Sequence, residues 1–176
     1  MRSFKLYWNL HRWTGIILAA VFAGTAVTGF LLLIKKKVAW IQPPTMEGEA
    51  GDPGAFMPVG DAFEIVLAQG HPDFAVADDV DRIDVRPGDR VYKFQSKHHY
   101  AEIQVDAVTG AVLAVAPRRS DLIEDLHDGS FYGDWFHAWF MPLVAAGLLF
   151  LVCTGLWLWI EPKLYRRKRR RRSASS

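Results

Sequence analysis

Two long hydrophobic stretches dominate the pattern of the chain. Residues 13–34 and 138–160 run for 22 and 23 positions without a single Asp, Glu, Lys or Arg. A helix rises about 1.5 Å per residue, so either stretch can cross a hydrocarbon core of roughly 30 Å. Lipid leaves no partner for unpaired backbone groups, which restricts spanning segments to helices and closed barrels. The pattern therefore predicts two transmembrane helices, and it excludes a soluble globular protein.

The region between the two stretches has a different periodicity. Residues 35–57 are rich in Pro and Gly towards their end and are predicted to form a linker. From residue 58 onwards, apolar residues recur at the spacing of one amphipathic helix that ends at Gly70. Apolar and polar residues then alternate in four short segments up to residue 117, which indicates a three- or four-stranded antiparallel meander. We expect a small α+β domain over 58–117 and an interfacial segment over 118–137. The predicted fold is a membrane α-helical hairpin with this domain inserted.

Charge is distributed unevenly. Residues 38–134 hold 18 acidic and 7 basic side chains, although the whole chain has a formal net charge of +2. Eleven Lys and Arg residues lie in the terminal segments, 1–12 and 161–176, against three in the triplet Lys35 to Lys37. The positive-inside rule then predicts cytoplasmic termini and a periplasmic central domain, although the lysine triplet weakly favours the reverse. We interpret the basic tail as an orientation signal that contacts membrane lipid, and we expect no nucleic acid as a partner.

Three motifs, in a fixed order, resemble a known family. They are Leu10-His11-Arg12-Trp13-x-Gly15, then Val105-Asp106-Ala107-Val108-Thr109-Gly110-Ala111-Val112-Leu113, then Leu126-His127-Asp128-Gly129-Ser130-Phe131-Tyr132-Gly133-Asp134-Trp135 ahead of a helix that ends Thr154-Gly155-Leu156-Trp157-Leu158-Trp159. The combination resembles the short, two-helix form of the PepSY-associated transmembrane family, with the middle motif matching the closing hairpin of a PepSY domain. Larger members are associated with iron and siderophore uptake, and their histidines bind b-type haem and pass electrons to ferric iron. The resemblance implies a haem-b inner-membrane electron-transfer protein that reduces ferric iron or a ferric siderophore.

Three histidines are the candidate ligands of that haem: His11, His127 and His137. Side chains at membrane depth that can take a proton or a metal are rare and often functional, and imidazole is a common axial ligand of haem iron. His11 and His137 begin two antiparallel helices, so they are expected about 30 Å apart in depth and unable to hold the same haem within one chain. No catalytic residue beyond these ligands is assigned.

Two arrangements satisfy this geometry. In the favoured one, a homodimer forms a four-helix bundle in which symmetry-related histidines hold a haem at either face. In the other, His127 and His137 of one chain bind a single haem near the outer surface. The small residues of the first helix, at positions 15, 19, 23, 24 and 28, support close packing either with a second copy or with the second helix of the same chain.

A different class of function competes with the redox proposal. The chain could be a non-enzymatic membrane-anchored PepSY module that binds or regulates a partner protein such as a peptidase. His98 and His99 could bind a metal, but neighbouring strand residues point to opposite faces, and a solvated turn is the preferred interpretation. The sequence has no glycine-rich nucleotide loop, Ser/His/Asp order or CxxC pair, so hydrolase or dinucleotide chemistry has no support.

Overall fold

The computed structural model describes residues 2–173, with side chains described from residue 4 to residue 167, and it divides into two compact units. The helix unit comprises Met1–Gly29 and Asp125–Ser176, and the sheet unit comprises Phe30–Glu124. The predicted tail lies partly outside the described residues, since side chains after residue 167 and the whole of 174–176 are not described.

Two long helices form most of the helix unit. They are α1 (Arg2–Ile34) and α4 (Met141–Ser173), each 33 residues long, and α3 (Arg119–Asp128) ends in the same unit. A 3₁₀ turn at Ser130–Tyr132 and a π-helical turn at Phe136–Phe140 join α3 to α4. The spans Phe4–Lys37 and Phe136–Arg167 are long and apolar enough to cross a membrane. The two predicted membrane helices are confirmed, and both helices extend beyond their uncharged stretches.

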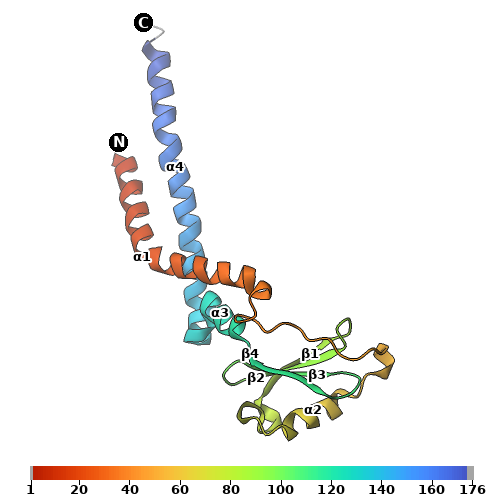
Figure 1. Cartoon of the computed structure of the whole chain (residues 1–176). Helices are drawn as coiled ribbons and strands as arrows, with labels where there is room; N and C mark the ends of the chain where they lie inside the picture. Colours follow the sequence, from red (N-terminus) through yellow and green to blue (C-terminus); the bar gives the residue numbers. More distant parts are fainter. Residues whose placement is uncertain (1, 174–176) are drawn as a thin grey trace. The chain divides into compact units, whose positions relative to one another are not determined.

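Helices α1 and α4 pack antiparallel. As residue numbers increase along α1, the numbers of the residues that they contact on α4 decrease. The Tyr7 and Trp157 rings lie 6.5 Å apart, and Gly15 and Gly147 approach the side chains of Leu151 and Leu18. The first part of α1 runs beside α4, with the start of α1 and the end of α4 on the same side, and α1 then bends away part-way along its length (Figure 1).

The small residues of α1 divide between two surfaces. Gly15 packs against Leu151 and Thr28 contacts the end of α3, so both serve contacts within the chain. Ala19, Ala23 and Gly24 are exposed, and a methyl group added at Gly24 would meet no atom within 4 Å. Within the chain, therefore, this second set of small residues leaves a stretch of α1 uncovered.

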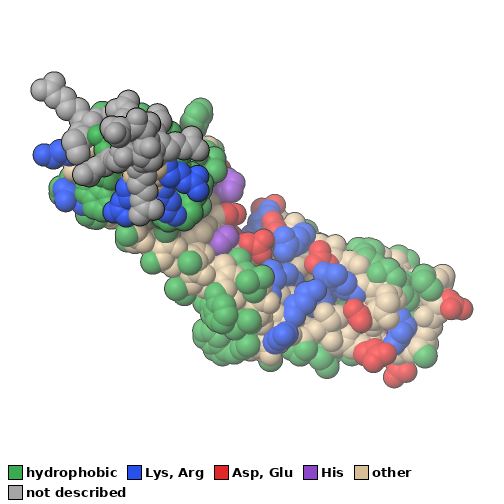
Figure 2. Space-filling model, turned by 90° about the horizontal axis from the view of Figure 1, so that it is seen from above, with side chains coloured by type: hydrophobic (Ala, Val, Ile, Leu, Met, Phe, Trp, Pro, Cys, Tyr) green, Lys and Arg blue, Asp and Glu red, His purple; other side chains and the backbone are tan. Residues whose placement is uncertain are grey.

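The outer surface of the helix unit is apolar. Ile17 and Leu149 are exposed by 72% and 67%, as expected of side chains that face lipid. Figure 2 looks down on the helix end and shows hydrophobic side chains there with Lys and Arg side chains among them. This surface suits a helix pair embedded in a bilayer.

The sheet unit contains a four-stranded antiparallel sheet in the order β1-β2-β3-β4. The strands are β1 (Val80–Arg86), β2 (Val91–Ser96), β3 (Ala101–Asp106) and β4 (Val112–Pro117), with α2 (Val59–Ala68) on one face. Short 3₁₀ turns lie at Lys35–Lys37, Pro53–Ala55, Pro72–Phe74 and Ala77–Asp79. The predicted helix and the four-strand version of the predicted meander are confirmed.

The apolar face of the sheet packs under α2. Ala62 and Val66 of α2 are fully buried against Phe94, Ile103 and Val105 of the two central strands. These strand residues occupy alternate positions, so their side chains share one face of the sheet.

The opposite face of the sheet is polar and also buried, and residues 44–49 lie against it. The Met46 amide donates to Gln104, the Glu49 amide donates to Asp106, and the Met57 amide donates to the Ala107 carbonyl. Gln104 and Asp106 are each 1% exposed. The segment predicted as a linker on its Pro and Gly content is thus bonded along much of its length to the sheet. The exact domain limits proposed from the sequence stay a prediction.

Candidate functional site

His11 lies on the side of α1 that faces α4. Its Nδ1 atom is 2.8 Å from the Oγ1 atom of Thr154, and the Thr154 side chain is buried. His11 itself is half-buried, and its Cε1 atom approaches Gly155, the residue after Thr154. The first candidate ligand is therefore anchored to the partner helix by one ring nitrogen.

His127 occupies the last turn of α3 and faces the opposite end of the helix pair. Its Nδ1 atom is 3.0 Å from Thr28 Oγ1 and 3.1 Å from the Thr25 carbonyl oxygen, both on α1. Helix α3 ends at Asp128, and the next residue, Gly129, has a φ of 83° in the left-handed region that a side chain would strain. This sharp turn separates His127 from the start of α4.

His137 lies in the π-helical turn before α4 and is exposed. Its Nδ1 atom is 2.9 Å from the Asp128 carbonyl oxygen and 3.8 Å from an Asp128 carboxylate oxygen. Partial burial raises the pKa of Asp128, but hydrogen bonds from the Ser130 hydroxyl and amide outweigh it and leave that pKa below its ordinary value. The carboxylate is thus ionised beside the exposed imidazole. Isolated π turns occur often at functional sites.

The three histidines divide into two groups. His11 and the Thr28 partner of His127 are 17 residues apart on α1, which is about 25 Å along a helix. Because α1 bends, this figure is an upper limit to their straight-line distance. His127 and His137 lie at the same end of the helix pair, because Asp128, the residue after His127, accepts a hydrogen bond from His137. The predicted separation of His11 from the other two candidates agrees with this arrangement.

The anchoring threonines were not predicted from the sequence. The sequence does contain a signal for them. A His-x-Trp motif begins at both His11 and His137, and in each case a Thr-Gly pair follows, with the threonine 17 residues after the histidine. The repeat becomes meaningful only once α1 and α4 are known to lie antiparallel.

The comparison with protein families covers both units. A model of the PepSY-associated TM region matches residues 8–176, which is almost the entire chain. The chain belongs to the PepSY-associated transmembrane family. With its two long apolar helices, this PepSY-associated protein is a membrane protein. A search of curated proteins gave no match.

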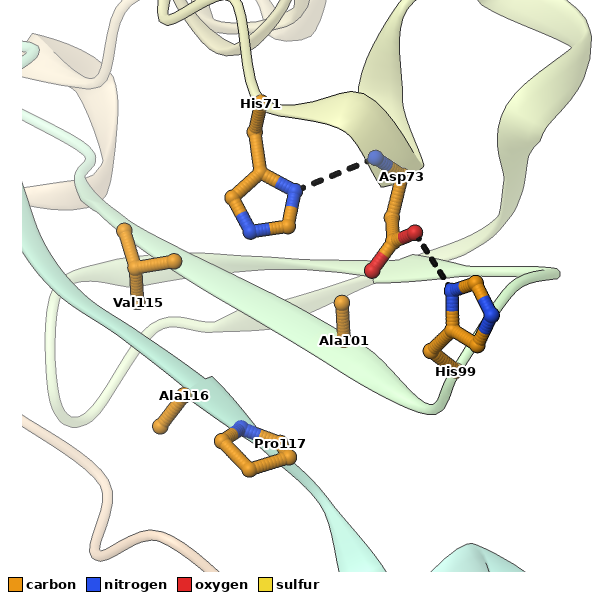
Figure 3. Close-up of a pocket in the computed structure, with 7 residues that line it drawn as sticks. All are labelled: His71, Asp73, His99, Ala101, Val115, Ala116 and Pro117. Carbon is orange, nitrogen blue, oxygen red and sulfur yellow. Dashed lines mark hydrogen bonds and ion pairs between the residues drawn. The ribbon is translucent and has the colours of Figure 1, made fainter.

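The sheet unit of this PepSY-associated protein has a candidate site of its own, a cavity of about 250 Å³ beside strand β4. It is lined by His71, Asp73, His99, Ala101, Val115, Ala116 and Pro117. Figure 3 shows His71 and Asp73 on one side of the cavity and the β4 residues on the other. Asp73 accepts a 2.7 Å contact from His99 Nδ1, and its amide donates to His71 Nδ1 at 3.2 Å. The cavity thus combines one carboxylate, imidazole rings and an apolar floor.

His98 and His99 lie in the turn between β2 and β3, as expected, and each pairs with a different carboxylate. His98 Nε2 is 3.1 Å from Asp79, and His99, whose side chain is 85% exposed, contacts Asp73. Within residues 2–173, no group of three or more His, Cys, Asp or Glu side chains could hold a metal ion.

Proposed function

We propose that this membrane protein is a haem-b electron-transfer protein of the bacterial inner membrane, with cytoplasmic termini and a periplasmic sheet unit. It would pass electrons from a cytoplasmic or membrane electron donor to ferric iron or a ferric siderophore, which is reduced. The observation that carries the proposal is the state of the candidate histidines. Each of His11, His127 and His137 engages Nδ1 with a partner in its own chain, and these contacts do not involve the Nε2 atoms.

Such half-engaged imidazoles fit a haem. An axial histidine offers iron one nitrogen, while its other nitrogen is fixed by a hydrogen bond to the protein. Haem iron held by histidine would supply one-electron chemistry between its ferric and ferrous states. His11 would serve at one end of the helix pair, and His127 or His137 at the other.

A second copy of the chain would complete the site. Two helices cannot enclose a flat macrocycle, whereas a four-helix bundle offers side chains from facing helices. Ala19, Ala23 and Gly24 are exposed on α1, and small residues allow close helix approach in membranes. We therefore propose a homodimer in which each haem takes one histidine from either protomer.

The outer, acidic part of the chain supports a role with cationic iron. Residues 38–134 carry 18 acidic against 7 basic side chains, and such an excess attracts cations and raises their local concentration.

An absorption spectrum of the detergent-solubilised protein, oxidised and then reduced, tests the proposal. We expect a Soret band that shifts on reduction, and we expect alanine substitutions at His11, His127 and His137 to lower the haem content. The matched controls are His98→Ala and His99→Ala in the sheet unit, which should retain haem. A protein without a Soret band, even after haem supplementation, would exclude this function.

A second candidate function has its own support. Strands β1 and β4 are the edge strands of the sheet, and they differ: β1 carries Asp81, Arg82, Asp84 and Arg86, whereas β4 has no charged residue. Charged residues on an edge strand discourage pairing with another chain, and β4 lacks this protection beside the cavity. Strand β4 could accept an extended segment of a partner protein, as expected of a non-enzymatic module that binds or regulates a peptidase.

Two replacements separate these functions. Exchanging both membrane helices for unrelated ones should abolish ferric reduction but leave partner binding intact. Val115→Lys, on the exposed part of β4, should block strand addition and leave haem content unchanged. Full function in a chain without His11, His127 and His137 would favour the binding module.

A further inference from the structure

The same sequence motif occurs along both membrane helices, which run antiparallel. His11-x-Trp13 precedes Thr28-Gly29 on α1, and His137-x-Trp139 precedes Thr154-Gly155 before and along α4, with the same spacing of 17 residues from His to Thr. Each Thr-Gly pair contacts a histidine that comes from another helix: Thr154 contacts His11, and Thr28 contacts His127. Two ends of the helix pair therefore present the same local arrangement.

Each of the two threonine hydroxyls also lies within hydrogen-bonding distance of a carbonyl oxygen on its own helix. Thr154 Oγ1 donates to the Phe150 carbonyl at 2.7 Å, and Thr28 Oγ1 donates to the Gly24 carbonyl at 2.9 Å. A hydroxyl has a single proton and two lone pairs, so each oxygen can only accept from its histidine. When the hydroxyl donates to its carbonyl, the proton in the His–Thr contact is on Nδ1 of the ring.

A second contact supports this assignment at His127. Its Nδ1 atom also lies 3.1 Å from the Thr25 carbonyl oxygen, which can only accept a hydrogen bond. The same reasoning applies to His137, whose Nδ1 atom faces the Asp128 carbonyl at 2.9 Å. The contacts of all three candidate ligands fit a proton on Nδ1, and a neutral ring of this form has its lone pair on Nε2.

The glycine of each pair gives the ring room. A methyl group at Gly29 would lie 3.1 Å from His127 Cε1, and one at Gly155 would lie 3.3 Å from His11 Cε1. Both distances are tighter than ordinary van der Waals contact. The Thr-Gly pair therefore acts as a unit in which the hydroxyl accepts from Nδ1 while the missing side chain lets the ring approach the helix.

We propose that Thr28 and Thr154 are positioning residues that hold His127 and His11 in the Nδ1-protonated tautomer, so that Nε2 is the atom offered to iron. The inference rests on the proposed haem function, and it adds the residues that decide which nitrogen binds. It also predicts that each end of the helix pair uses one Thr-Gly pair of its own.

The tautomer is measurable without haem. Nitrogen-15 NMR of the full chain, labelled at histidine and free of haem in detergent at pH 8, should give Nδ1-protonated signals for His11 and His127, assigned from single histidine substitutions. Thr154→Val and Thr28→Val keep the side-chain shape but remove the acceptor, and each should alter the signal of its own histidine alone. Thr154→Ser and Thr28→Ser should restore it. Thr14→Val on α1 is the control, because no described contact joins Thr14 to a histidine.

Haem affinity provides the second measurement. Loss of a partner that orients a metal-binding histidine typically weakens metal binding by about 10- to 100-fold. We expect a loss of that size in both valine variants, with recovery in the serine variants and no change in Thr14→Val. Unchanged histidine signals and unchanged haem affinity in the valine variants would overturn the inference. Wild-type protein that shows the expected tautomers but binds no haem would support the tautomer assignment and overturn the proposed function instead.

Discussion

The two units differ in how their polar side chains are hydrogen-bonded. In the sheet unit, Glu102 is 1% exposed, and its two carboxylate oxygens pair with Lys93 at 3.4 Å and with Arg118 at 3.0 Å. In the helix unit, the imidazoles of His11 and His127 engage one nitrogen each. A buried polar network that satisfies its own members maintains a fold, whereas a ring anchored on one side is available to a ligand on the other.

The comparison explains why the buried charges of the sheet unit are not proposed as a site. Arg118 also donates to Asp121 at 2.8 Å, and Gln104 donates to both Glu102 and the Pro44 carbonyl. Burial lowers the pKa of Arg118, but Asp121 and Glu102 outweigh it and hold that pKa above its ordinary value. The network joins the strands to the segments that cover them, and its role is structural.

Glu102→Ala should have the largest effect, because it leaves Lys93 and Arg118 buried without their shared carboxylate. Breaking a buried ion pair from one side typically costs about 3–5 kcal/mol. Amide hydrogen exchange of the full chain in detergent should show this loss as reduced protection of β2 and β3. Glu47→Ala is the control: Glu47 is 79% exposed opposite Arg90, and such pairs are worth about 0–1 kcal/mol. Equal effects of the two variants would contradict the structural role of the network.

Asp106→Asn should have a smaller, pH-dependent effect. Burial raises the pKa of Asp106, but hydrogen bonds from the Glu49, Val108 and Thr109 amides outweigh it and lower that pKa. A lowered folded-state pKa stabilises the fold above the unfolded value of about 3.9, and this contribution is lost as pH falls through the folded value.

At pH 7 the Asn variant should be less stable by about 1–3 kcal/mol, the usual cost of leaving buried hydrogen-bonding groups unsatisfied. Hydrogen exchange or unfolding measured from pH 7 down to pH 3 should show a shallower loss of stability in the variant than in the wild type. Parallel pH profiles would show that this carboxylate does not secure residues 41–57 to the sheet.

Alanine substitutions of helix glycines should have the smallest effect and probe the helix unit. Gly→Ala inside a helix typically stabilises by about 0.5–1 kcal/mol, and Gly15→Ala should show this gain because its methyl group would make only an ordinary contact, 3.8 Å from Leu151. Gly29→Ala and Gly155→Ala should gain less, because their methyl groups would press on His127 and His11. Thermal unfolding in detergent compares the three, and equal gains would argue against close imidazole packing.

Much of the architecture could be predicted from local patterns. The uncharged stretches at residues 13–34 and 138–160 lie within α1 and within the π turn and α4, and alternation in the central region marks all four strands. Residues 41–57 were harder to interpret. Their Pro and Gly content indicates irregular backbone, but it does not indicate that the backbone would bond to Gln104 and Asp106, about 60 positions later.

The sequence by itself determined the two membrane helices, the meander, the family and the three candidate histidines, because hydropathy, periodicity and short motifs depend on residues that are close in the chain. Only the tertiary structure decided which atoms those histidines use. His11 meets Thr154 across 143 positions and His127 meets Thr28 across 99. Such pairs depend on the antiparallel register of the helices and on the bend and turns that place α3, and those depend on packing along the whole length of the elements.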